Sequence, residues 1–129
     1  MTPAAATVLV VDDNRLNLEL VTDVLAGAGY SIRQAASAEE ALEAARAEHH
    51  DMILMDIGLP GMDGYAAVRA LKDDPATRDI LTVALTAAAM AGDQERALRS
   101  GFDGYIAKPI QTRTLARTVG QLLEGKEKP

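Results

Sequence analysis

An uninterrupted apolar run, Met52 to Met55, leads directly into Asp56, and a turn with three glycines and one proline follows between residues 58 and 64. The run is too short for a helix and shows no polar alternation, so it predicts a strand buried on both faces, as in parallel sheets. Asp56 would then lie at the carboxyl end of this strand. In open α/β sheets, ligands bind at that edge. The segment therefore predicts a parallel α/β fold with a functional carboxylate at a strand end.

Four further short strands are predicted, and helices separate all of them. The strands cover residues 8–11, 30–35, 80–85 and 103–107. The first predicted helix runs from an N-cap at Asn14 to Gly29, and the second from a Ser37–Glu40 capping box to a loop at His49-His50. Three more helices are predicted at 65–72, within 87–100, where Gly101 closes the helix, and at 112–123. The apolar stripe of the first helix consists of Leu18, Val21, Leu25 and Ala28. The histidine pair is interpreted as part of the loop, without a metal role.

Strands that alternate with helices require crossover connections and a parallel sheet. The pattern predicts an α/β fold, a doubly wound five-stranded parallel sheet of (βα)5 type in the flavodoxin-like order 2-1-3-4-5. Such a sheet has its switch point between the first and third strands. A length of 129 residues fits one domain. We expect a flexible leader at residues 1–6, the folded domain at 7–124 and a charged tail at 125–129.

Polar side chains stand at the carboxyl ends of four predicted strands. They are Asp12 and Asp13 after the first, Asp56 at the third, Thr86 at the fourth and Lys108 at the fifth. Taken singly, each has a structural explanation: a helix cap for the Asp pair, and a strand end or turn for the others. The carboxyl ends of parallel strands meet at one edge, so the sequence predicts a shared site there.

Three carboxylates at one edge repel one another unless a cation neutralises them. Mg²⁺ prefers oxygen ligands and retains several waters. Asp13 and Asp56 are the expected ligands, with Asp12 binding directly or through water. The backbone carbonyl of Gly58 could complete the protein's share. The sequence thus predicts a magnesium site open to phosphate oxygens.

The Lys108 ammonium and the Thr86 hydroxyl would complete what a phosphoryl group needs during transfer. Asp56 is the expected nucleophile, because a carboxylate can form an aspartyl phosphate. The alternative is a small Mg²⁺-dependent phosphohydrolase that uses the same chemistry. Such enzymes commonly carry a second Asp two residues after the nucleophile, where this chain has Gly58.

Composition excludes several other classes of function. The net charge of −6 and a pI near 4.8 disfavour binding to nucleic acid or to an anionic membrane. The absence of cysteine excludes disulfides and thiolate metal sites. No signal peptide or membrane span is evident, so we expect a cytoplasmic protein.

The motifs at the strand ends resemble those of the receiver domains of two-component response regulators, the CheY-like family, and the similarity extends over nearly the whole chain. The matching segments are Val10–Asn14, Leu54–Gly64, Leu85–Ala87 and Gly104–Ile110. Features similar to stand-alone receivers of the DivK type, and to receivers of hybrid histidine kinases, are Asn14, Asn17 and Ala89–Asp93.

The resemblance implies a role for each residue of the predicted site. Asp56 is expected to accept the phosphoryl group, and Asp12 and Asp13 to bind Mg²⁺. The Gly58 carbonyl is expected to be the third protein ligand of Mg²⁺, and Thr86 and Lys108 are expected to bind phosphoryl oxygens. The resemblance also implies a cis peptide bond at Lys108–Pro109 and an aromatic switch at Tyr105.

The implied function is that of a single-domain response regulator in a phosphorelay. Its expected partners are a histidine kinase or histidine phosphotransfer protein as donor, with the side of the first helix that carries Leu16 and Leu20 as the expected docking side, and a downstream target protein. Phosphorylation is expected to remodel the face formed by the helix within 87–100, the strand 103–107 and the helix 112–123. The protein would catalyse only its own phosphorylation and dephosphorylation. The short segment after Lys108 leaves no room for an output domain.

Overall fold

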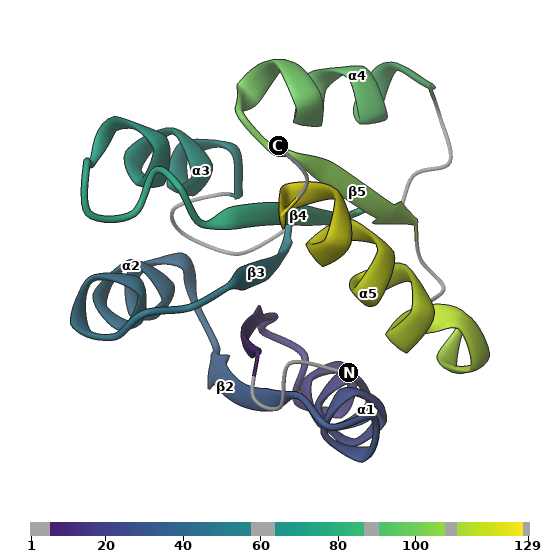
Figure 1. Ribbon diagram of the computed structural model, residues 1–129. Coiled ribbons are helices and arrows are strands. Elements are labelled where there is room, and N and C mark those ends of the chain that lie inside the picture. Colours follow the sequence, from purple (N-terminus) through teal and green to yellow (C-terminus); the bar gives the residue numbers. More distant parts are fainter. Residues whose placement is uncertain (1–5, 58–63, 87–90, 108–110, 128–129) are drawn as a thin grey trace.

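In the computed structural model, the described residues are 6–57, 64–86, 91–107 and 111–127, and their five strands form one sheet with helices on both faces (Figure 1). The strands are β1 (Thr7–Val11), β2 (Ser31–Ala35), β3 (Met52–Asp56), β4 (Leu81–Thr86) and β5 (Gly104–Ala107). The helices are α1 (Arg15–Gly27), α2 (Ala38–Ala47), α3 (Gly64–Asp73), α4 (Ala91–Ser100) and α5 (Thr112–Glu127). Every strand boundary falls within one residue of the prediction.

The strand order is β2-β1-β3-β4-β5, and all four neighbouring pairs are parallel. This confirms the predicted order and places β3 at the centre of the sheet, between β1 and β4. All five residues of β3 are buried. The two strands on either side of the switch point, β1 and β3, are therefore direct neighbours.

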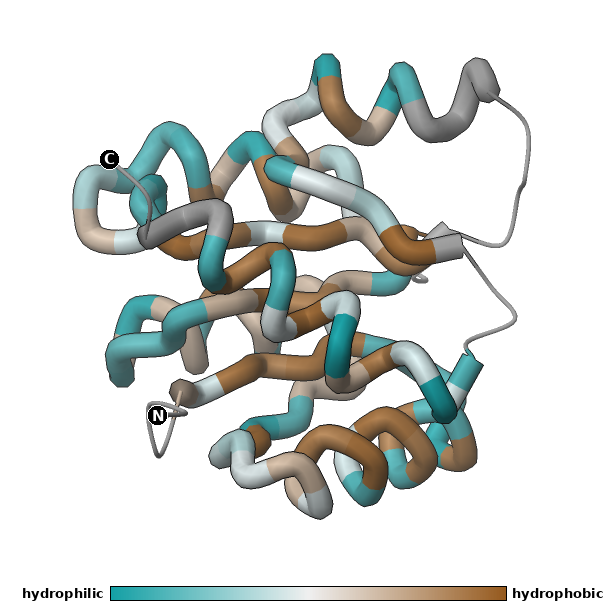
Figure 2. The backbone as a smooth tube through the Cα atoms, turned by 45° about the vertical axis from the view of Figure 1, so that its right-hand side comes forward, coloured by the Kyte–Doolittle hydropathy of each residue, from teal (hydrophilic) through white to brown (hydrophobic). Residues whose placement is uncertain are grey.

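Two aliphatic layers hold the helices on the sheet, one on each face. On one face, α1 and α5 pack on β-strand residues that include Val8, Val10 and Leu54. On the other face, α2, α3 and α4 pack on strand residues that include Leu9 and Ile53. Successive strand residues thus point to opposite faces and both faces are covered, which explains the continuous apolar runs. Figure 2 shows these runs as apolar strands in the interior, while the helices alternate between apolar and polar residues.

The predicted caps of the first two helices and the predicted glycines after the first and fourth helices are confirmed. The Asn14 side chain accepts a hydrogen bond from Asn17 N at 3.1 Å and so caps α1. The Ser37 hydroxyl oxygen accepts one from Glu40 N, also at 3.1 Å, and caps α2. Gly29 and Gly101 follow α1 and α4 with φ of 101° and 119°, a conformation that glycine adopts without strain.

Three details differ from the sequence predictions. Ala6, assigned to the leader, is buried, and its carbonyl accepts a hydrogen bond from Ser31 N at 3.0 Å. Ala28 is exposed because α1 ends at Gly27, one residue before it. The last helix, predicted to end at Leu123, continues to Glu127 and so includes the start of the segment assigned to the tail. None of the helices in the described ranges is long and apolar enough to cross a membrane.

Candidate functional site

Asp12 is fixed at the point where β1 ends. Its backbone N–H donates to the carbonyl of Ala35 on β2 at 3.1 Å, which extends the pairing of the two strands by one residue. Its Oδ1 accepts a hydrogen bond from Asn14 N at 2.9 Å, just before α1 begins. With 1% of its surface exposed, Asp12 is a buried carboxylate held by the strand on one side and the helix start on the other. Asp13, the next residue, is exposed.

Asp56 is the last residue of β3 and lies beside Leu85 of β4 in the sheet register. The next residue, Ile57, still donates its backbone N–H to the carbonyl of Leu85 at 3.1 Å. The strand pairing therefore continues past Asp56 and fixes its backbone. The Asp56 side chain is at the boundary of burial, with 9% of the residue exposed.

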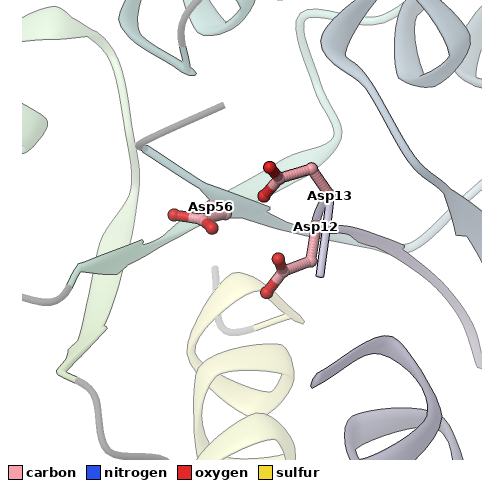
Figure 3. A group of neighbouring side chains, drawn as sticks. All are labelled: Asp12, Asp13 and Asp56. Carbon is pink, nitrogen blue, oxygen red and sulfur yellow. The ribbon is translucent and has the colours of Figure 1, made fainter. Parts of the chain in front are cut away.

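The structure brings these three carboxylates together, as predicted (Figure 3). One carboxylate oxygen of each of Asp12, Asp13 and Asp56 lies within 4.8 Å of those of the other two. In Figure 3 the Asp12 and Asp13 carboxylates lie on the side of their backbone that faces Asp56. Three such charges repel one another strongly at this distance. Their oxygens are the donors that a hard divalent cation prefers, so the cluster fits Mg²⁺.

The other predicted site residues are placed only in part. Thr86 ends β4 and pairs with Ala107 of β5 in the register, but its side chain is outside the described part of the structure. Gly58, Lys108 and Pro109 also lie outside the described residues, as does the predicted cis bond. Tyr105 is described, and it stands on β5 with 38% of its surface exposed.

The beginning of α3 is in direct contact with the Asp56 end of β3. A Cβ on Gly64 would lie 2.9 Å from Ile57 Cα and 3.0 Å from the Asp56 carbonyl oxygen. The Gly64 backbone N–H donates to the carbonyl of Ile57 at 3.3 Å. The sequence showed Gly64 only as part of a turn. The structure shows that it allows the helix to approach the site closely.

His50 differs from its interpretation as an ordinary loop residue. It is fully buried at the amino end of β3, whereas His49 is exposed. Its Nδ1 lies 3.1 Å from the carbonyl oxygen of Glu48, and within the described residues its Nε2 has no hydrogen-bond partner. Burial lowers the pKa of His50 below its ordinary value of 6.5, an effect opposed in part by the Glu48 carbonyl. This residue is at the opposite end of β3 from Asp56.

Comparison with known proteins decides the family. The sequence model of the response regulator receiver domain matches residues 8–120. The chain belongs to the response regulator receiver domain family. The matched range includes the Asp cluster and all five strands, so the cluster lies in a receiver domain.

The receiver domain is similar to curated proteins along their whole length. The polar-differentiation response regulator DivK of Brucella ovis is 42% identical over 117 residues, which are 91% of this chain and 95% of that protein. The DivK protein of Brucella anthropi is 40% identical over the same shares of both chains.

Solved structures agree with the fold of this receiver domain. The chemotaxis response regulator CheY4 of Vibrio cholerae has a TM-score of 0.87 and 29% identity, covering 92% of this chain and 98% of that one. The receiver domain of the sensor histidine kinase PA1611 of Pseudomonas aeruginosa has a TM-score of 0.85 and 34% identity, covering 94% and 99%. That structure holds a magnesium ion in its active site cleft. The predicted relationship to CheY-like receivers is confirmed.

Proposed function

We propose that this receiver domain accepts a phosphoryl group on Asp56 with the help of Mg²⁺. The observation that supports this most directly is the cluster of Asp12, Asp13 and Asp56 at the switch point between β1 and β3. Backbone hydrogen bonds hold the chain at Asp12 and next to Asp56, the Asp12 carboxylate also accepts one from Asn14 N, and Asp13 is exposed to solvent. A donor protein could reach such a site from outside.

Each residue of the site has a distinct proposed role. Asp12 and Asp13 hold Mg²⁺ together with Asp56 and the backbone carbonyl of Gly58. Thr86 donates a hydrogen bond to one phosphoryl oxygen, and the Lys108 ammonium pairs with another; the Lys108–Pro109 bond is cis. Bound Mg²⁺ supplies positive charge that balances the carboxylates and the phosphoryl oxygens. The protein contributes position, since β1 and β3 fix the two buried carboxylates before the donor arrives.

The proposed chemistry is a transfer followed by hydrolysis. An Asp56 carboxylate oxygen attacks phosphorus, and the P–N bond of a donor phosphohistidine breaks. The electron pair stays on the histidine nitrogen, which takes a proton from solvent. In the second step water attacks phosphorus, inorganic phosphate leaves and the Asp56 carboxylate is restored. The protein thus acts only on its own phosphoryl group.

The proposed output is the face made by α4, β5 and α5. Phosphorylation adds a charge of about −1.5 to −2 and three acceptor oxygens. Thr86 is drawn toward these oxygens, and the Tyr105 ring turns inward. The proposed partners are a histidine kinase or histidine phosphotransfer protein as donor and a downstream target protein, and the proposed location of this receiver domain is the cytoplasm. As for DivK, we propose that the receiver domain acts as a stand-alone regulator, without nucleic acid or membrane.

The phosphohydrolase alternative is not favoured, because the family match and the similarity to DivK identify a signalling domain. Turnover separates the two functions experimentally. A receiver modifies itself once per cycle, whereas a phosphohydrolase releases product from an added phosphomonoester many times.

The decisive experiment is the intact mass after incubation with acetyl phosphate and Mg²⁺. We expect one phosphoryl adduct on the wild type, lost on removal of Mg²⁺ and in Asp56→Asn. Asp23→Asn, which removes an exposed carboxylate from α1, is the matched control and should keep the adduct. An adduct that persists in Asp56→Asn, or that forms equally well without Mg²⁺, would contradict the proposed site.

A further inference from the structure

The described side chains of helix α4, those at 95–100, make little apolar contact with the rest of the domain. Among its side chains at 95–100, which the structure describes, only Ala97 is buried. Glu95, Leu98 and Arg99 are exposed, and Glu95 and Arg99 form an exposed ion pair at 3.7 Å. A small alanine contributes little buried area, so other contacts must fix this helix.

One such contact is made by Arg96. Its guanidinium carbon lies 4.1 Å from the ring centroid of Tyr65, which belongs to α3. This is a cation–π distance. The same ring meets Phe102 edge to face, with centroids 6.4 Å apart and an interplanar angle of 78°. Phe102 follows α4 directly and is buried. Tyr65 therefore contacts α4 itself and the connection after it, and it joins α3 to α4, neighbouring helices on one face of the sheet (Figure 1).

Tyr65 directly follows Gly64, the residue of α3 that lies against the Asp56 end of β3. The preceding residue, Gly64, has room for only a hydrogen where a Cβ would meet the Asp56 carbonyl oxygen at 3.0 Å. It is hydrogen-bonded to the carbonyl of Ile57 as well. A shift at the end of β3 or at Ile57 is therefore expected to displace the start of α3, because Gly64 is hydrogen-bonded to the Ile57 backbone and has no room for even a Cβ beside the Asp56 carbonyl oxygen.

We propose that the stacked pair Tyr65–Arg96 is a latch that fixes α4 against α3, and that a phosphoryl group on Asp56 weakens it through Gly64. This inference deepens the proposed function and rests on it. A group with added volume and charge at the β3 end displaces the closely packed start of α3, and the Tyr65 ring moves with it. A stacked contact depends on the distance between guanidinium and ring, so a small displacement weakens it. The hold on α4 is then reduced.

The first arm of the test measures the latch without any ligand. Hydrogen exchange of the backbone amides at 95–100 is compared in the wild type, Arg96→Gln and Arg99→Gln. The two substitutions remove the same charge from the same helix, but only Arg96 contacts Tyr65. We expect exchange about two- to fivefold faster in Arg96→Gln, the factor that a partly exposed cation–π contact represents. Arg99→Gln should match the wild type. Tyr65→Leu should behave like Arg96→Gln, and Tyr65→Phe, which keeps the ring, like the wild type.

The second arm measures coupling to the site by titration with beryllium fluoride and Mg²⁺, a stable mimic of the phosphoryl group. If binding weakens the latch, a protein without the latch binds the mimic more tightly by the same two- to fivefold factor, because coupling is reciprocal. Arg99→Gln should bind like the wild type.

The outcomes separate the latch from the proposed function. Unchanged exchange in Arg96→Gln would overturn the latch, even if the mimic binds normally. Faster exchange with unchanged affinity for the mimic would overturn its coupling to Asp56. If the wild type binds no mimic and forms no adduct, the proposed function fails, and the coupling fails with it. Faster exchange together with tighter binding supports the whole inference.

Discussion

Replacing Gly64 with alanine tests the close contact between α3 and the strand that ends in Asp56. The new Cβ would lie 2.9 Å from Ile57 Cα, a separation that folded proteins essentially never show, and 3.0 Å from the Asp56 carbonyl oxygen, which is also a tight contact. Both neighbours are backbone atoms in or next to a central strand, so they cannot rotate away as a side chain could. The start of α3 must therefore move.

Overpacking of this kind costs about 1 to 3 kcal/mol. Replacing glycine by alanine recovers about 0.4 to 1 kcal/mol from the unfolded chain where the backbone allows it. We expect Gly64→Ala to lower the free energy of unfolding by about 1 to 2 kcal/mol, measured by urea denaturation. Acetyl phosphate should also modify it more slowly, by up to about tenfold, because the helix start moves away from Asp56.

Gly27→Ala is the matched control. This residue ends α1, and apart from its chain neighbours and its own helix backbone no atom lies within 4 Å of the position its Cβ would take. Alanine there should stabilise the protein by about 0.5 to 1 kcal/mol and leave phosphoryl uptake unchanged. A Gly64→Ala protein as stable as the wild type, with normal uptake, would refute the reasoning from backbone contact.

Three further predictions concern pH, a partly exposed polar network and the metal. The pKa of His50 is lowered in the folded protein, so the unfolded chain binds more protons than the folded protein as pH falls through 6.5. The wild type should therefore lose stability as pH falls through 6.5, by at most about 1.4 kcal/mol per pH unit. His50→Gln should lack this dependence when unfolding is measured from about pH 7.5 to 5. Lys72→Met removes donors to the carbonyls of Arg78 and Ile80 and to Asp103 Oδ2, and should cost about 1 to 2 kcal/mol in urea unfolding; a loss below 0.3 kcal/mol would show that the network is not needed. Mg²⁺ should raise the thermal midpoint of the wild type. Asp13→Asn should bind Mg²⁺ at least about tenfold more weakly, as measured by calorimetry. In a metal chelator, however, Asp13→Asn should be more stable than the wild type, because one of the three repelling charges is gone.

The fold and the acidic cluster could be predicted because they follow from local patterns and one topological rule. The apolar runs at Val8–Val11 and Met52–Met55 define strands buried on both faces, and the aspartates come directly after them. A parallel sheet brings such strand ends to one edge, whatever their separation in sequence. Asn14 marks a helix start for a similar reason, since its cap is satisfied within four residues.

Contacts between distant side chains could not be predicted in the same way. The stack of Tyr65 with Arg96 depends on how far apart α3 and α4 lie, which no local pattern reports. The burial of His50 was also missed, because a histidine pair before an acidic residue resembles an exposed loop in sequence. Gly64 illustrates a third limit: a glycine in a turn and a glycine at a close backbone contact have the same appearance in sequence.

The burial of β3 has a consequence for how this receiver domain can vary. Every residue of the strand is buried, and its neighbours on both sides are paired strands, so the strand that carries Asp56 acts as a fixed reference frame. A signal at Asp56 must therefore be expressed by the segments that begin where the strands end, and by the helix contacts next to them. Substitutions in the aliphatic layers should change stability with little effect on signalling. Substitutions after the strand ends should retune signalling, and those that avoid close backbone contacts such as the one at Gly64 should do so at little cost in stability. The stability of the domain and its signalling response are thus separable properties, and substitutions can change one without the other.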